Sequence, residues 1–305
     1  NQIQNFTNSQ KGFIRKALSE WSDVANIEFV EVQELGNDVG TIRFGATTYD
    51  DDSWGWTWFG PTNNFYSSAA DIWLTSATME SIISNANNVI SGTRLDWAPG
   101  TFEYSVFLHE IGHALGLDHP FEGFSFPAGY DQSKYTVMSY TQYRDDFIEY
   151  SPMVYDIAAI QHLYGANTST NSSNTVYKFD SNVSTTDVKP MLDTIWDGGG
   201  IDLIDMSSLL NPCDINLNDG TYSKAGYSLS GFENDYYLGI ALGTIIENAN
   251  GGKASDIIRG NEYSNQIDGK GGNDIIYGGG GSDIFVCSVG GGSDIIKDFD
   301  PNEDL

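Results

Sequence analysis

Basic residues are scarce in this chain of 305 residues, because 14 lysines and arginines stand against 42 aspartates and glutamates, for a formal net charge of -28. A surface so poor in cations cannot replace the counterions of a nucleic acid or dock electrostatically on an anionic membrane. We therefore expect no nucleic-acid partner. The excess of acid has two interpretations: a soluble, self-repelling surface, or carboxylates that neutralise a hard cation such as calcium.

Long apolar runs and cysteines are scarce as well. No stretch of 18 apolar residues occurs, so the sequence predicts no membrane insertion. The two cysteines, Cys213 and Cys287, match neither a zinc knuckle nor a disulfide framework. We expect two free thiols, and a single bridge between them stays open. No signal peptide opens the chain and its end falls at the approach to a strand, so we expect missing material at both ends.

The composition changes near residue 165. Before that point, apolar periodicity predicts helices at 7–24, 102–117 and 154–164, and strands at 27–32, 41–44 and 71–74. Thr7 and Gln10 offer a capping box for the first helix, and the stretch 49–66 is expected to form irregular loop and ribbon. An Asn-, Ser- and Thr-rich segment then leads into short strands and turns without a helix. The sequence predicts an α+β domain over 1–165 and an all-β domain over 166–305.

One short segment carries the pattern H-E-x-x-H-x-x-G-x-x-H. On a helix, His109 and His113 project from one face toward one metal ion. Glu110 can reach a metal-activated water without binding the metal, and Gly116 permits the turn that brings His119 back as a third ligand. Three nitrogen ligands leave one position for water, which is typical of a catalytic zinc site. A bare H-E-x-x-H arises by chance, but three of the four histidines of the chain fall in this segment.

The extended pattern is the metzincin signature, and His119-Pro120 resembles the serralysin branch of that clan, in the M10 family. The residues around Met138, Thr136 to Tyr140, resemble the family's methionine-containing turn. The resemblance implies a zincin-like catalytic domain with one catalytic Zn²⁺. It also implies that Met138 lies beneath the metal without binding it. Tyr140 would be a further zinc ligand that swings away to hydrogen-bond the developing oxyanion.

Two further segments resemble parts of this family. The stretch 152–161 is similar to the helix that follows the methionine turn. Within it, Asp156 is either a partner that orients the site or an acid favoured by the helix dipole, and the sequence leaves both open. The stretch Asp71–Leu74 resembles the edge strand along which metzincins lay an extended substrate by main-chain pairing.

A nine-residue period begins at Gly251. The sixth position of each turn is an acid or an amide, and the eighth is apolar: Asp256, Asn265, Asp274, Asp283 and Ile258, Ile267, Ile276, Phe285. This is the G-G-x-G-x-D-x-U-x pattern of calcium-binding parallel β-rolls. Carboxylates and loop carbonyls supply hard oxygens, and the apolar residue packs inward. A flexible Gly- and Asp-rich linker would not keep an apolar residue at a fixed period.

The repeat pattern predicts calcium ligands throughout these turns: Gly252, Ala254, Asp256, Asn261, Tyr263, Asn265, Lys270, Gly272, Asp274, Gly279, Gly281 and Asp283. The second turn is degraded at Asn261, Tyr263 and Asn265, so a site there is expected to be weaker or missing. A further set resembles a serralysin calcium site joining the β-roll to a flanking sandwich: Asp197, Gly199, Gly200, Asp202 and Glu247. We expect several structural Ca²⁺ ions and a module that folds only with calcium.

The resemblance implies a secreted, extracellular bacterial zinc endopeptidase that is stabilised by calcium. Glu110 would assist attack of a zinc-activated water on peptide bonds of extracellular proteins. Expected partners are protein or peptide substrates and, as a further option, a small protein inhibitor, with a monomeric enzyme. One alternative is a calcium-binding RTX (β-roll repeat) adhesin or scaffold with a vestigial zinc site, which the complete set of site residues disfavours. A zinc amidase acting on non-protein amides is a second alternative.

Overall fold

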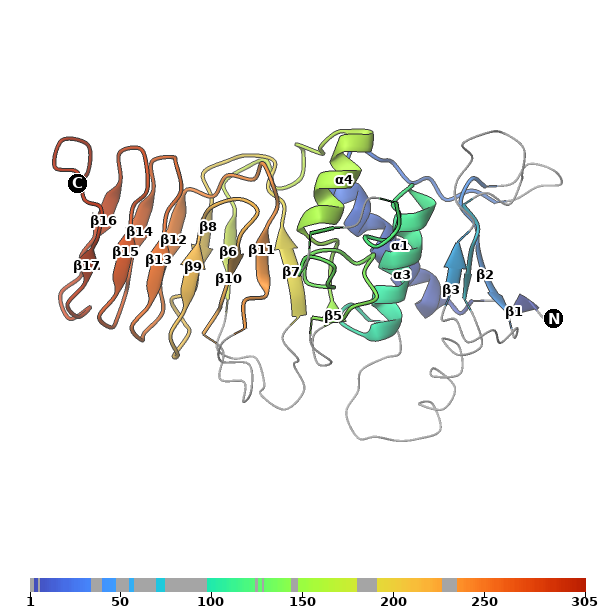
Figure 1. Ribbon diagram of the computed structural model, residues 1–305, viewed down its shortest axis with the longest axis horizontal. Helices are drawn as coiled ribbons and strands as arrows, with labels where there is room; N and C mark the ends of the chain where they lie inside the picture. The colour runs from blue at the N-terminus through green and yellow to red at the C-terminus, as the bar shows by residue number, and fades with distance from the viewer. Residues whose placement is uncertain are drawn as a thin grey trace. The chain divides into compact units, whose positions relative to one another are not determined.

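The computed structural model describes residues 3–4, 6–33, 40–47, 55–57, 70–74, 98–123, 126–127, 129–143, 148–179, 191–226 and 235–305 (Figure 1). The chain forms two compact units, Asn1–Ala166 and Asn167–Leu305. In the described part of the chain, no helix combines the length and apolar character that a bilayer crossing requires.

Among its described residues, the first unit contains three helices: α1 (Asn8–Val24), α3 (Phe102–Ala114) and α4 (Val154–Tyr164). The predicted capping box of α1 is confirmed, because the Thr7 hydroxyl accepts from the Gln10 amide and the Gln10 side chain accepts from the Thr7 amide. Its apolar face buries Ile14, Ala17 and Trp21. The helix α4 has the predicted bounds.

The helix α3 is shorter than predicted, since it ends at Ala114 and not at Leu117. The reason is Gly116, which has a φ of +101° that side-chain-bearing residues rarely adopt. The chain reverses there, and the Leu117 amide donates back to the Gly112 carbonyl at 2.9 Å. This early stop turns the following residues toward the helix face that carries the first two histidines.

The sheet of the first unit has the strand order β1 (Ile3–Gln4), β2 (Phe44–Thr47), β4 (Ile72–Leu74) and β3 (Gly55–Thr57). The strand β4 pairs in parallel with β2 and antiparallel with β3. The expectation that Asp71–Leu74 is an edge strand is therefore wrong: β4 is internal, and β3 is the outer strand of the described sheet.

Other strand predictions in this unit need correction. Residues 27–32 form no strand, and Val30 and Val32 are 69% and 60% exposed. Alternation alone does not make a strand, because its main-chain groups need a neighbouring ladder. The strand predicted at 41–44 begins only at Phe44. Of the stretch 49–66, predicted as irregular loop and ribbon, the described part, 55–57, is a strand; the rest lies outside the described residues. A short strand, β5 (Ile148–Glu149), precedes α4.

The second unit is a parallel β-roll, and Figure 1 shows its strands in successive turns. One stack of parallel strands runs in the order β16 (Ile284–Val286), β14 (Gln266–Asp268), β12 (Asn248–Asn250), β8 (Leu203–Asp205) and β6 (Val176–Lys178). The other runs β17 (Ile295–Ile296), β15 (Ile275–Tyr277), β13 (Ile257–Arg259) and β9 (Asp214–Asn216). Beside them, β11 (Leu238–Ile240) pairs in parallel with β7 (Met191–Ile195) and antiparallel with β10 (Tyr222–Ser223). The predicted all-β fold is confirmed.

The interior of the roll is a ladder of apolar residues in register. Ile258 lies opposite Ile215 and Ile276 in neighbouring strands, and all three are buried. The eighth repeat positions therefore point inward as predicted, while Phe285 in a terminal turn is only half-buried. The roll also extends beyond the continuous nine-residue register, from β6 upstream to β17 downstream. Residues 197–205 and 289–297 carry a similar Gly-Gly-Gly-x-Asp pattern outside that register.

Candidate metal centre

The three histidines of the motif converge at one point. The Nε2 atoms of His113 and His119 are 3.0 Å apart, and those of His119 and His109 are 3.3 Å apart. The ligand atoms of all three lie within 4.8 Å of one another. The helix α3 supplies two of the rings from one face, and the turn at Gly116 supplies the third.

The protonation pattern of these rings fits a cation. Nδ1 of His109 donates to the Val137 carbonyl and Nδ1 of His113 donates to the Leu117 carbonyl, each at 2.8 Å. Burial lowers the pKa of His109 to about 3 and also lowers the pKa of His113, so both rings are neutral at pH 7. Their Nε2 lone pairs then face one another with no proton between them. Nitrogen ligands at about 2.0–2.1 Å from a tetrahedral zinc are about 3.3 Å apart, which these distances match.

The third histidine has neighbours that sequence reasoning did not identify. Nδ1 of His119 lies 3.2 Å from Oε2 of Glu122, and the ring of Phe121 stacks on the imidazole with centroids 4.8 Å apart. Both residues follow the motif directly, so their proximity was the available signal. Their effect is to orient a ring that comes from a turn and not from a helix.

The methionine turn lies against the histidine helix. Met138 is buried, and a Cβ placed on Gly112 would come within 2.6 Å of the Met138 sulfur. The ring of Tyr140 lies 5.5 Å from the His109 ring and 4.6 Å from the His119 ring, yet its side chain is 68% exposed. Tyr140 therefore borders the histidine cluster on its solvent side. Met138 packs against α3, the helix that carries His109 and His113.

Asp156 performs both roles that the sequence left open. Its carboxylate accepts from the Met153 amide at 2.8 Å, which satisfies a donor at the start of α4. It also accepts from the Thr136 hydroxyl at 2.6 Å and from the Val137 amide at 2.7 Å. Because the Val137 carbonyl holds the ring of His109, Asp156 acts on the histidine cluster through the backbone of one residue, Val137. Burial raises the pKa of Asp156 to about 6 despite these donors.

Glu110 is enclosed beside the histidines. Its side chain is 5% exposed, and burial raises its pKa to about 7. The Thr57 hydroxyl, on strand β3, donates to Oε2 at 2.6 Å and works against that rise. A carboxylate with a pKa near neutrality can accept and release a proton under ordinary conditions. Thr57 was not identified from the sequence, since it lies in a stretch that was expected to be irregular.

In the second unit, three of the predicted calcium residues form one acidic cluster. Asp202 is fully buried; its amide donates to Oε2 of Glu247 at 2.7 Å, and its Oδ2 has no hydrogen-bond partner. Burial raises the pKa of Asp202 to about 6, with the charges of Asp197 and Glu247 adding to the rise. The backbone at Gly199 and Gly200 has a positive φ and wraps this cluster. A buried carboxylate oxygen without a donor, beside two further acids, fits a bound cation.

The acids of the repeat turns form ladders along the roll. The Asp256 amide donates to Asp274 at 2.8 Å, and the Asp274 amide donates to Asp294 at 3.0 Å. A second ladder contains Asn265, Asp283 and Asp304. Oδ2 of Asp274 is buried without a partner, as at Asp202. Asp294 and Asp304 extend the predicted set; they follow 20 and 21 residues after their partners, so the strict period concealed them.

The backbone of these turns approaches closely enough to bring carbonyls together. Lys270, Gly272, Gly279 and Gly281 all have a positive φ. A Cβ at Gly272 would lie 2.4 Å from the Ala254 carbonyl, so the turns of Ala254 and Gly272 stack directly. Gly252 donates its amide to Asp256. The predicted main-chain positions are thus adjacent in space to the acids of the same ladder.

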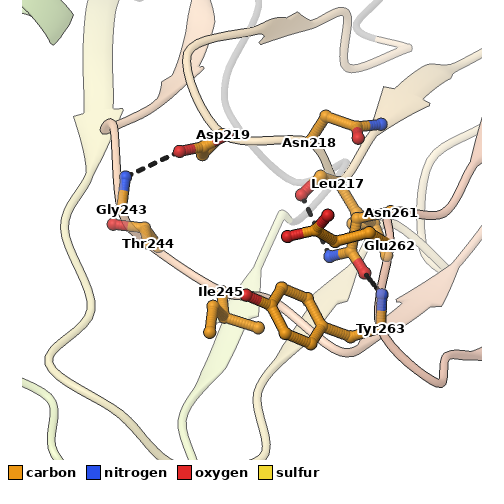
Figure 2. A pocket seen from close by; sticks show the side chains of 9 residues that line it. All are labelled: Leu217, Asn218, Asp219, Gly243, Thr244, Ile245, Asn261, Glu262 and Tyr263. Atoms are coloured by element: carbon orange, nitrogen blue, oxygen red, sulfur yellow. Dashed lines mark hydrogen bonds between the residues drawn. The ribbon is translucent and has the colours of Figure 1, made fainter. Parts of the chain in front are cut away.

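The degraded second turn is held by amides. Nδ2 of Asn265 donates to the Glu247 carbonyl at 2.9 Å and to Oδ1 of Asn261 at 3.1 Å, while Nδ2 of Asn261 donates to the Ile246 carbonyl at 2.8 Å. Figure 2 shows this turn beside a cavity of about 260 Å³, with the Tyr263 ring next to Ile245. Amide donors occupy carbonyls here, and the sixth position lacks a charge. This turn has no orphaned carboxylate oxygen such as that of Asp274.

Comparisons with known proteins agree with these two units. The matrixin model of the peptidase M10 family matches residues 2–165, and the peptidase M10 serralysin C-terminal model matches residues 166–305. The chain is 36% identical over 277 residues to serralysin B of Dickeya chrysanthemi, covering 83% of this chain and 53% of that protein. It is 35% identical over 292 residues to a serralysin of Proteus mirabilis (86% and 56%). It is 33% identical over 287 residues to the metalloprotease AprA of Pseudomonas entomophila (85% and 55%). The chain spans about half the length of the curated relatives it matches.

Proposed function

This chain belongs to the peptidase M10 family, with a matrixin domain followed by a serralysin C-terminal domain, and from that premise we propose that it is a secreted zinc-dependent endopeptidase. Residues 1–165 would be the catalytic domain and 166–305 the calcium-binding RTX domain. The observation that carries the proposal is the convergence of three imidazoles beside a buried carboxylate.

His109, His113 and His119 would hold one Zn²⁺, with Tyr140 as a further ligand from the exposed side. When bound, zinc supplies Lewis-acid activation of water and of a carbonyl oxygen. The hydrogen bonds to Val137 and Leu117 hold two of the three rings with their Nε2 lone pairs toward the ion. The arrangement is thereby ready for a metal without a change of tautomer.

Glu110 would act as the general base and then as the general acid. It takes the proton from the water that attacks the carbonyl carbon, and it passes that proton to the nitrogen of the leaving amine. Its pKa, raised to about 7 by burial, suits both transfers. Tyr140, beside the rings of His109 and His119, would donate its hydroxyl proton in a hydrogen bond to the developing oxyanion.

The outer strand β3 would bind the substrate. It pairs with β4 on one side, and its other edge pairs with no described strand. An extended peptide can add to such an edge by main-chain hydrogen bonds, which place one peptide bond at a fixed distance from the metal. This supports cleavage within protein or peptide chains over cleavage of small amides.

The acids of the second unit would hold several structural Ca²⁺ ions. One site would use Asp197, Gly199, Gly200, Asp202 and Glu247. Others would use the side chains or carbonyls of the stacked turns: Gly252, Ala254, Asp256, Lys270, Gly272, Asp274, Gly279, Gly281 and Asp283. We expect the turn of Asn261, Tyr263 and Asn265 to hold calcium weakly or not at all, because amides occupy its carbonyls. We further propose an extracellular bacterial enzyme that acts as a monomer, with a small protein inhibitor as an additional partner.

The test is casein cleavage by the purified chain and by Glu110→Ala, each with and without a zinc chelator in excess calcium. We expect cleavage only by the zinc-loaded wild type. If neither protein cleaves although both are folded and bind zinc, an RTX adhesin with a vestigial site or a zinc amidase replaces the protease. A small-amide substrate panel then separates these two.

A further inference from the structure

Strand β3 lies against the side chain of Glu110. The hydroxyl of Thr57 lies 2.6 Å from Oε2 and 3.0 Å from the main-chain oxygen of the same glutamate. A hydroxyl carries one proton, so it donates to one of these acceptors at a time, and both belong to Glu110. Thr57 thus contacts the side chain and the backbone of one residue on α3.

The other carboxylate oxygen faces Gly55, two residues earlier on the same face of the strand. A Cβ at Gly55 would lie 3.1 Å from Oε1 and 3.3 Å from Cγ of Glu110, and 3.2 Å from the Trp73 carbonyl. A larger residue would displace the carboxylate, because the Trp73 main chain blocks the opposite direction. The Thr57 hydroxyl and the space beside Gly55, which has no side chain, together set the position of the Glu110 carboxylate.

This contact matters because a glutamate has three rotatable side-chain bonds and would otherwise sample several rotamers. A general base must lie within hydrogen-bonding distance of the proton it removes, and a misplacement of about 1 Å costs about a hundredfold in rate. We propose that Thr57 is a positioning residue that holds Glu110 for proton transfer. The Glu110 carboxylate lies in the space that Gly55 leaves open because it has no side chain. The inference rests on the proposed function of Glu110. Thr57, which would position the base, lies on β3, the strand proposed to bind the substrate.

The test compares Thr57→Val, which keeps the shape and removes the hydroxyl, with Thr57→Ser, which keeps the hydroxyl. For cleavage of a fluorogenic peptide, we expect Thr57→Val to lower kcat about tenfold with KM changed by less than about twofold. Thr57→Ser should retain kcat within about twofold. Gly55→Ala should lower kcat although the Thr57 hydroxyl is still present. A kcat of Thr57→Val equal to the wild type, or an equal loss in Thr57→Ser, would overturn the proposal.

Two further measurements separate a positioning role from other roles. Zinc affinity, from competition with a chromophoric chelator, and the thermal midpoint should be the same in Thr57→Val and the wild type. Weaker zinc binding in Thr57→Val would show that the hydroxyl acts on the metal site, and would overturn the proposal. Glu110→Asp withdraws the carboxylate from Thr57, so adding Thr57→Val to it should change kcat by less than about twofold. A full additional loss there would show that Thr57 does not act through Glu110.

Glu110→Gln distinguishes this inference from the proposed function. If Glu110→Gln cleaves as well as the wild type, the assignment of the base is wrong, whatever Thr57 does. If Glu110→Gln is inactive and Thr57→Val is fully active, the protease proposal stands and the role of Thr57 is wrong.

Discussion

The first unit gathers its polar side chains in one cluster, whereas the second unit repeats them along the roll. In the first unit, three imidazoles converge, and their orientation depends on single contacts such as the carbonyl of Val137 and the carboxylate of Asp156. In the second unit, charged acids recur along the roll, and each is held by an amide from a neighbouring turn. A single site needs neighbours specific to it, whereas a repeated site reuses one backbone geometry.

The difference predicts different dependence on metal. Neutral nitrogen ligands repel one another only weakly, so the first unit can keep its shape without an ion. The stacked acids carry charge into a buried ladder, and the orphaned oxygens of Asp202 and Asp274 have no donor. We therefore expect zinc to serve chemistry in the first unit and calcium to serve folding in the second.

Removal of calcium should have the largest effect and test that comparison directly. Each site saturated at about a thousand times its Kd contributes about 4 kcal/mol to stability. We expect EGTA to abolish the cooperative unfolding transition of the roll, measured by circular dichroism on heating the full chain. A zinc-selective chelator in excess calcium is the control and should leave that transition in place. An identical melting curve with and without EGTA would contradict the calcium assignment.

The apolar ladder of the roll should contribute next. Ile267 is fully buried, so Ile267→Ala should lower the free energy of unfolding by about 3 kcal/mol in saturating calcium. Ile284, on an outward position of β16, is 44% exposed. Ile284→Ala should therefore change the free energy of unfolding by less than about 0.5 kcal/mol. Denaturant titration measures both. Equal losses in the two variants would show that the eighth positions do not form the core.

Asp156→Asn should lower the affinity for zinc, although Asp156 is not among the expected zinc ligands. The amide cannot accept from the Thr136, Val137 and Met153 donors as the carboxylate does, so the carbonyl that holds His109 loses its support. We expect zinc affinity to fall by about 10- to 100-fold, measured by chelator competition. Glu31→Gln, at an acid that pairs with Arg15 on the surface, is the matched control and should leave zinc affinity unchanged. Unaltered affinity in Asp156→Asn would remove Asp156 from the site.

Acidification should have the smallest effect, and it should act through calcium binding. Burial raises the pKa of Asp202 and of Asp274 to about 6, above their usual 3.8. Calcium binds the ionised carboxylates, so its affinity should fall by roughly tenfold per pH unit below 6 for each protonated group. The thermal midpoint of the calcium-loaded roll should therefore fall as the pH is lowered from 7 to 5. A midpoint that does not fall below pH 6 would contradict this coupling.

Local sequence patterns predicted much of both units. The capping box at Thr7, the bounds of α4, the turn at Gly116 and the inward eighth positions of the repeats follow from contacts within a few residues. Two predictions that were wrong concern pairing over long distances: the strand at 27–32 and the edge position of Asp71–Leu74. The end of α3, in contrast, was placed beyond the local turn at Gly116. Alternation indicates which face of a segment is apolar, but a partner strand decides whether the segment joins a sheet and where it lies in it.

The sequence by itself determined the identity of the three convergent histidines and the periodic acids, because a helix turn and a nine-residue repeat set those spacings locally. Only the tertiary structure decided which groups support them. Thr57 and Gly55 reach Glu110 from a strand 53 to 55 residues away, and Asp156 reaches the peptide that holds His109 from another helix. The amides of Asn261 and Asn265 that close the second turn likewise bond to carbonyls outside their own repeat. Such contacts depend on how separate elements pack, and no local spacing encodes that packing.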